Sequence, residues 1–286
     1  MTKSRASQNS FRRNNRGVSP AISTVILTSA IVMLLLVTVA FANNFLNARM
    51  AENEFSAMEQ FMQTVGLQID DVAWTIGRTQ TIRYASKFGQ VNFQSVALNY
   101  SVYVKKGATW TRLLTHTAGI VLFNMPISKY SISNNYFERI IPSSDGSFLQ
   151  QGTSAPINHV FSVEKLPMPD GSYIRVVVAP SLRMLNSTIK IGSDTKNYFK
   201  FYLAYLMQGS NPRYSQSTTI TGRNVTRITE SDVDSVRINA TFPSGSLGFS
   251  SDFFKFKNNA ETISVPNDSI VEFYLGEVVV SLGLYA

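Results

Sequence analysis

Residues 12–42 read RRNNRGVSPAISTVILTSAIVMLLLVTVAFA: a basic cluster, a small residue and then a long apolar run. No Asp, Glu, Lys, Arg or His occurs between Arg16 and Arg49. Because about 20 apolar residues are enough to cross the hydrocarbon layer of a bilayer, this run is long enough to span a membrane as a helix. It is too long for the core helix of an ordinary domain. The stretch therefore predicts a membrane-inserted α-helix near the N-terminus.

Every charged residue ahead of the run is basic, and the first acidic residue of the chain is Glu52. Basic residues next to a membrane helix stay on the cytoplasmic side. We therefore expect the N-terminus in the cytoplasm and the chain after Ala48 outside. The basic residues are Lys3, Arg5, Arg12, Arg13 and Arg16.

Three kinds of N-terminal segment share this layout. A secretory signal has an apolar region of about 7–15 residues and then a small-x-small cleavage site. Residues 40–42, Ala-Phe-Ala, have that form, although the apolar run before them is longer. A plain signal anchor fits the length and needs no special residues at its cytoplasmic edge. In the third kind, a leader is removed on the cytoplasmic side, before the apolar run.

The residues around Gly17 favour the third kind. The segment RGVSP, residues 16–20, resembles the cleavage region of class III signal peptides, the leaders of type IV pilin-like proteins. The following AISTVILTSAIVMLLLV resembles the N-terminal segment of archaeal type IV pilins and flagellin-like filament subunits, and the resemblance covers about the first 45 residues. It implies that a prepilin peptidase cuts between Gly17 and Val18, next to Arg16. Unlike bacterial pilins, the chain has Ile22 where an acidic residue is typical.

The same resemblance implies a subunit of an archaeal surface filament. Its partners would be copies of itself in a helical homopolymer, the prepilin peptidase, and a pilus assembly ATPase with a membrane platform. The precursor would sit in the membrane and the mature form in the extracellular filament. An uncharged helix leaves lipid only for another apolar environment, which a bundle of identical helices provides. The residues expected to pack between helices are Ile22, Val25, Ile26, Ile31, Leu34, Leu35 and Val39.

The helical pattern continues beyond the membrane run. Apolar residues recur at steps of four and three from Ala51 to Ile76, with polar residues between them, which predicts an amphipathic helix. Gly66 allows a bend within it, and Gly77 stands where a C-terminal cap would. The apolar stripe packs either on the outer domain of the same chain or on helices of other subunits.

From about Ser86 apolar residues alternate, and aromatic residues, Ser and Thr become frequent, which predicts an antiparallel sandwich or barrel-like head. Asp170-Gly171 predicts a hairpin turn, and Gly276 a bulge in the last strand. The predicted fold class is α+β, with a long hydrophobic helix before the head. The strands are expected at 98–104, 118–124, 160–166, 173–179, 184–191, 198–207, 218–228, 233–242 and 270–284.

The chain is thus predicted to have four parts. Residues 1–17 are a basic leader, 18–48 a transmembrane and assembly helix, 49–85 an amphipathic extension and linker, and 86–286 an extracellular β-rich head.

The composition of the chain excludes several kinds of chemistry and binding. The chain has no Cys, which excludes disulfides, thiol catalysis and Cys-based metal sites. The net charge of +8 reflects the leader, because 21 basic residues face 18 acidic ones once its five basic residues are set aside. The 12 Tyr and 19 Phe are explained by cores and cross-strand pairs, so nucleic acid is not an expected partner.

The chain contains five acceptor sequences for N-glycosylation. Asn99 and Asn239 lie on the polar faces of their predicted strands and are expected to be exposed. The five residues are Asn99, Asn186, Asn224, Asn239 and Asn267.

The sequence contains no recognisable catalytic or cofactor-binding motif. The only histidines, His116 and His159, are expected to be ordinary strand residues. The adjacent carboxylates of Asp70 and Asp71 point in different directions on their helix, so they do not form a single site. Asp232 and Asp234 would share a strand face and offer a weak cation site. We therefore expect no enzyme activity, metal or cofactor.

The leading hypothesis is a filament subunit. The alternatives are a monomeric membrane-anchored surface binding protein or minor pilin and, last, an anchored hydrolase built from distant carboxylates.

Overall fold

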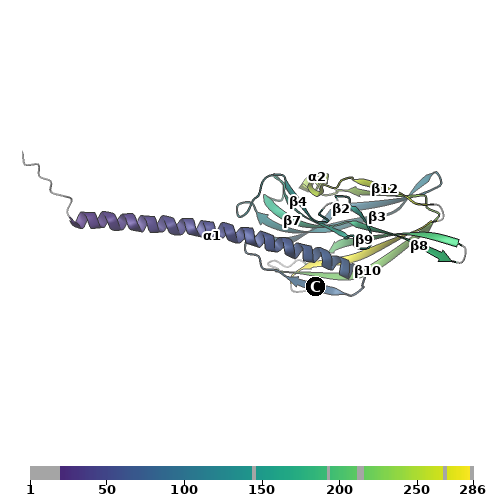
Figure 1. The fold of residues 1–286 in the computed structure, drawn as a ribbon, viewed down its shortest axis with the longest axis horizontal. Helices are drawn as coiled ribbons and strands as arrows, with labels where there is room; N and C mark the ends of the chain where they lie inside the picture. The colour runs from purple at the N-terminus through teal and green to yellow at the C-terminus, as the bar shows by residue number, and fades with distance from the viewer. Residues whose placement is uncertain (1–19, 144–145, 192–193, 211–215, 267–268, 284–286) are drawn as a thin grey trace, which may run out of the picture. The chain divides into compact units, whose positions relative to one another are not determined.

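The computed structural model describes residues 20–143, 146–191, 194–210, 216–266 and 269–283. They form a long N-terminal helix, α1, and a β-rich region with two sheets, which confirms the α+β class (Figure 1). By its internal contacts the chain divides into two compact units, Met1–Arg49 and Met50–Ala286. The second unit contains the last part of α1 and all the strands, and we call it the head.

Helix α1 spans Pro20–Ala73. Proline suits the first turn of a helix, where its missing N–H would have no partner within the helix. The helix ends three residues before Ile76, the last residue of the predicted stripe. Gly77 adopts a left-handed conformation (φ 81°), and its N–H donates to the Gly222 carbonyl oxygen over 2.8 Å. Gly77 therefore belongs to the turn that leads into the first strand rather than to the helix end itself.

One sheet has six strands in the order β1-β10-β13-β9-β8-β5. Most neighbours are antiparallel, but β13 runs parallel to β9, and β5 runs parallel to β8. The head is thus not purely antiparallel. The strands are β1 Thr79–Arg83, β5 Leu149–Gln151, β8 Leu182–Ile191, β9 Asp194–Gln208, β10 Ser217–Ser231 and β13 Ser269–Leu282.

The other sheet has seven strands in the order β12-β11-β2-β3-β7-β6-β4, and every neighbouring pair is antiparallel. A 3₁₀ turn, η1 (Gly245–Leu247), and a four-residue helix, α2 (Ser251–Phe254), follow β11. The strands are β2 Gln90–Lys106, β3 Thr109–Pro126, β4 Tyr136–Ile141, β6 Asn158–Glu164, β7 Tyr173–Pro180, β11 Ser235–Thr241 and β12 Ala260–Ser264.

Each of the predicted strand segments coincides with a strand, although the ends differ by a few residues. The largest differences are in β2 and β3, which are far longer than the segments predicted for them. The strands β1, β4, β5 and β12 were not predicted, because they are short or lack a clean alternation of apolar residues. β6 and β7 pair antiparallel as expected, and Gly171 (φ 127°) lies in the loop between them.

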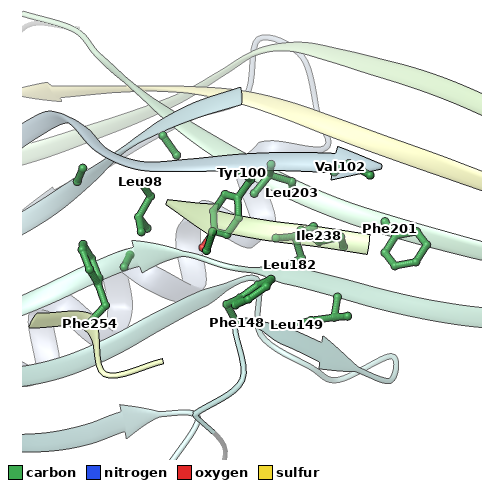
Figure 2. Close-up of a cluster of buried hydrophobic side chains, with 14 of the residues drawn as sticks. Leu98, Tyr100, Val102, Phe148, Leu149, Leu182, Phe201, Leu203, Ile238 and Phe254 are labelled. Carbon is green, nitrogen blue, oxygen red and sulfur yellow. The ribbon is translucent and has the colours of Figure 1, made fainter. Parts of the chain in front are cut away.

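A first apolar core lies between the two sheets (Figure 2). Leu98, Tyr100 and Val102 of β2 face Phe201 and Leu203 of β9, all of them almost wholly buried. The Tyr100 hydroxyl donates to the Pro180 carbonyl oxygen over 2.7 Å, so its one polar group has a partner. Cross-sheet packing of large side chains therefore joins the two layers.

A second apolar core surrounds the last part of α1. The strands of both sheets serve both cores, because alternate residues of a strand point to opposite faces. In β3, Ile120 and Leu122 enter the inter-sheet core, while Val121 and Phe123 pack in the core that contains α1. β7, β9 and β13 divide their residues in the same way. The last part of α1 is therefore buried within the head.

The amphipathic stripe was expected to pack either on the outer domain of the same chain or on helices of other subunits, and this second core decides between them. The stripe packs on the chain's own head, and only its last member, Ile76, is exposed, at 65%. The buried members are Ala51, Phe55, Met58, Met62, Val65, Ile69 and Val72.

Glycines permit the close approach of α1 to the sheets, and Gly276 does not form the predicted bulge. The helix continues through Gly66, where a β-carbon would lie 2.9 Å from Val160 Cγ2. At Gly276 a β-carbon would lie 2.6 Å from the Ala73 carbonyl oxygen, and the residue pairs regularly with Val225. The irregularity lies instead in β10, after Gly222. Gly66 thus leaves room for a valine side chain of β6, and Gly276 leaves room for the backbone of α1.

Replacing Gly276 by Ala tests this packing. We expect Gly276→Ala to lower the free energy of unfolding by about 1–3 kcal/mol, because the added methyl group meets backbone that cannot rotate away. Gly245→Ala is the matched control, since a β-carbon there meets nothing within 4 Å. Denaturant unfolding of the full chain in detergent measures both. Equal stability of the two variants would contradict the close contact.

Candidate functional site

The first part of α1 exposes apolar side chains on all its faces. The helix that begins here is long and apolar enough to cross a membrane. Its uncharged portion, from Ala21 to Ala48, is about 42 Å long at 1.5 Å per residue. Large apolar residues on every side are exposed, from Ile31 at 47% to Phe41 at 73%. A helix that is apolar all round needs a non-aqueous environment on all sides.

The seven residues predicted to pack between helices belong to this exposed surface. Their exposed fractions run from 47% for Ile31 to 67% for Leu34. Neighbours outside the set are equally exposed, such as Met33 at 72%. Exposure within one chain therefore makes the seven available for packing and does not set them apart from the rest of the helix.

Two threonine hydroxyl groups of this segment donate to the backbone of the helix itself. Thr28 Oγ1 donates to the Thr24 carbonyl oxygen over 2.9 Å, and Thr38 Oγ1 donates to that of Leu34 over 2.7 Å. A hydroxyl bonded to its own backbone costs little in hydrocarbon, where no water can serve as partner. These threonines are therefore compatible with a lipid or a protein environment.

The first charge after the apolar run lies next to an aromatic ring. The Arg49 guanidinium carbon is 5.5 Å from the centroid of Phe45. Aromatic residues and long cationic side chains are common where a helix leaves the hydrocarbon layer, because the ring stays in the interface while the charge reaches water. This pair marks a suitable outer boundary for the membrane-compatible segment.

Inside the head, Glu54 of α1 holds the turn at residues 86–89 through four hydrogen bonds. Burial opposes its ionisation, but the hydrogen bonds outweigh burial and lower the pKa of Glu54 below its ordinary value. The carboxylate thus ties α1 to the start of the sheet region. The donors are Ser86 Oγ (2.6 Å), Lys87 N (2.9 Å), Phe88 N (2.9 Å) and Gly89 N (3.2 Å).

Other polar contacts fix α1 farther along. Glu59 accepts a hydrogen bond from Ser162 Oγ over 2.6 Å, and burial raises the pKa of Glu59 despite this bond. Asn158 Nδ2 donates to the Gly66 carbonyl oxygen over 3.0 Å. These contacts join the helix to β6. None of them has a sequence signature, because each links residues about 90 to 100 positions apart.

The paired carboxylates Asp70 and Asp71 point to different partners, as expected. Asp70 accepts from Arg183 Nη1 (3.0 Å) and from Trp74 Nε1 (3.0 Å). Asp71 forms an ion pair with Arg78. Both carboxylates are therefore structural contacts at the end of α1.

Both histidines are strand residues with packing roles. His116 of β3 stacks on Tyr205 with ring centroids 4.8 Å apart, and burial lowers the pKa of His116. His159 of β6 is buried, and its Nε2 lies 3.0 Å from the Ser147 carbonyl oxygen. Among the residues that the structure describes, no three His, Asp or Glu side chains group as metal ligands would.

The expected Asp232–Asp234 pair does not share a strand face, which corrects that prediction. β11 begins at Ser235, and Asp232 lies in the preceding turn with a positive φ of 57°. Asp234 Oδ2 accepts from the Gly107 amide over 2.6 Å. The strand was predicted to begin too early, because Val233 is apolar and buried although it lies before the strand.

The sequons differ in exposure. Asn186 and Asn224 are exposed. Asn99 and Asn239 are half-buried rather than fully exposed, and the Oδ1 atom of each is buried without a hydrogen-bond partner among the described residues. Their strands pair side by side, so neighbouring side chains cover them. Asn267 lies outside the described residues.

The predicted leader cleavage residues, Arg16, Gly17 and Val18, also lie outside the described residues. Comparison of the chain with protein families, with curated proteins and with solved structures finds no match.

Replacing Glu54 tests the link between α1 and the turn at 86–89. We expect Glu54→Gln to cost about 1–3 kcal/mol at pH 7, because the carboxylate accepts four hydrogen bonds. The lowered pKa means that this stabilisation is complete above the ordinary Glu pKa of about 4.3 and is lost as the pH falls through the folded-state value. Unfolding from pH 7 to pH 3 should show the difference from wild type shrinking with acidity.

Glu230→Gln is the control for this measurement. Glu230 contacts Lys106 in an exposed ion pair, and such pairs contribute about 0–1 kcal/mol. A difference for Glu54→Gln that is small or independent of pH would show that the four hydrogen bonds do not stabilise the head.

Proposed function

We propose that this chain is the structural subunit of an archaeal type IV pilus-like surface filament, assembled through the first part of α1. The observation that carries the proposal is the contrast within this one helix. Its amphipathic stripe is buried in the chain's own head, whereas residues 22–42 are mainly apolar and exposed on every face. Only the first part thus needs an environment that the chain itself does not supply.

Two environments meet this need at different stages. Before processing, the basic leader holds the precursor in the membrane, because moving a Lys or Arg through its centre costs about 2.5–3.5 kcal/mol per residue. After cleavage between Gly17 and Val18, the helix carries no side-chain charge up to Arg49. It then passes into a bundle of copies of itself, where each buried Leu, Ile or Val contributes about 1.5–3 kcal/mol relative to water.

The proposed partners follow from the same resemblance. A prepilin peptidase removes residues 1–17, and an assembly ATPase with a membrane platform drives the helix from lipid into the filament. The head forms the outer layer and presents its exposed sequons, Asn186 and Asn224, to the medium. A head without Cys has no disulfides, and its two apolar cores support it in their place.

Terminal sequencing tests the processing step. The mature protein from cells should begin at Val18, and Gly17→Trp should leave the leader attached because a bulky residue then precedes the cut. Ala6→Trp, earlier in the leader, is the matched control and should be processed normally. An intact Met1 or a start near Asn43 in the functional protein would reject the leader assignment.

Filament assembly tests the role of the helix. Electron microscopy of sheared surface material should show filaments that contain this chain. Leu34→Ala should reduce the filament yield, because it removes apolar contact at a predicted packing position and still allows membrane insertion. Met33→Ala, one position away and outside the predicted set, should assemble near the wild-type level. If the wild type yields only membrane-bound monomers, the anchored surface binding protein is the better assignment.

A further inference from the structure

The head contains an open cavity of ≈ 530 Å³ that none of the contacts above explains. One wall comes from the start of β4 and the end of β6, and the other from α2 and the segment that leads to β12. In Figure 1, β4, α2 and β12 lie along the same edge of the head. Its volume is in the range of about 300–1,000 Å³ that is usual for small-ligand sites.

The charge of the lining favours an anionic ligand. Three lysines, Lys165, Lys255 and Lys257, line the cavity together with a single carboxylate, Asp252. Outside the leader the chain is close to neutral, so this is a local concentration of positive charge. Charges that converge in a hollow attract ligands of opposite sign more strongly than the same charges spread over a flat surface.

Two of the lysines are fixed by neighbouring groups. Lys255 ends α2 in a left-handed conformation (φ 47°), and its carbonyl oxygen accepts a hydrogen bond from Arg139 Nη2. Its ammonium nitrogen lies 4.9 Å from the centroid of Phe137. Lys165 Nζ donates to Ser250 Oγ over 3.3 Å. Side chains already held in place lose less conformational entropy when a ligand binds.

The remaining lining suits hydroxyl groups and a sugar ring. Asn135, Asn258 and Asn259 offer amides that both donate and accept, which is what a polyhydroxylated ligand requires. Asn135 has a positive φ of 68°, so both walls of the cavity contain a residue with left-handed backbone. Phe256 is half-buried and lines the same cavity; its ring packs on Phe254 and Phe148, and its uncovered part is the aromatic surface of the lining.

The acidic residues near the cavity are already engaged. The Tyr136 hydroxyl donates to Glu138, and Asn258 Nδ2 donates to Glu261 over 3.3 Å. These carboxylates, with Asp252, limit how much negative charge the cavity can accept. A ligand with isolated anionic groups on a neutral polar frame fits better than a dense polyanion.

We propose that this cavity binds a short acidic saccharide, a sugar bearing carboxylate or sulfate groups. The lysines pair with the anionic group, the asparagine amides form hydrogen bonds with the sugar hydroxyls, and Phe256 contacts the apolar face of a sugar ring. The proposal does not depend on filament assembly, because every residue that carries it belongs to the head.

Titration of the full chain in detergent micelles tests it with two probes, trigalacturonic acid and sulfated lactose. We expect saturable binding of at least one probe. The corresponding neutral sugar, methyl-esterified trigalacturonate or lactose, should bind about tenfold more weakly or less, because it lacks the charge that the lysines recognise. Lys255→Gln and Lys257→Gln should each weaken the charged probe about three- to tenfold. Lys190→Gln, an exposed lysine outside the cavity lining, should leave it unchanged.

Several results would overturn the proposal. Absence of saturable binding by both probes would do so, as would equal binding of charged and neutral sugars. Equal competition by inorganic sulfate or by single-stranded DNA would show a site for charge alone, not for a saccharide. Thermal unfolding of each variant shows whether it is folded. A loss of binding with unchanged unfolding assigns the loss to the cavity, whereas an equal loss in Lys190→Gln would reject that assignment.

Discussion

Burial of the apolar stripe between Ala51 and Val72 is the constraint on which the head depends. The strands of both sheets have two apolar faces, one for the opposite sheet and one for the helix. Without the helix, residues such as Phe123, Val178 and Val280 would be exposed to water. Burying one such side chain stabilises a protein by about 1.5–3 kcal/mol, so the sheets and the helix form one cooperative unit.

This packing explains why the two parts of α1 need different partners. The second part satisfies its apolar stripe through the head and its polar groups through Glu54, Glu59 and Asp70. The first part has no such stripe, because it is apolar all round, and the hydroxyls of Thr28 and Thr38 bond to its own backbone. It is therefore compatible with lipid and with a bundle of like helices, the two environments of the proposed assembly. The cavity lined by Lys165, Lys255 and Lys257 lies in the head and contains no residue of this helix in its lining.

Local patterns predicted much of the architecture. The charge-free run, the amphipathic stripe and the alternating strands are properties of neighbouring residues, and each was found where it was predicted. The predicted bulge at Gly276 was wrong. Glycine in a strand is typical of a bulge, but here it permits the backbone of α1 to approach, and which segment approaches is not a local property.

The amino-acid sequence by itself determined that the chain has one long membrane-compatible helix and a β-rich head. The length of an apolar run and the spacing of apolar residues depend only on residues that are close in sequence. Only the tertiary structure decided that β13 enters between β9 and β10 and runs parallel to β9. It also decided that Lys165 and Lys257 line one cavity although they lie far apart in the chain. Such pairings depend on long-range packing, in which many distant contacts form together and no single segment carries the information.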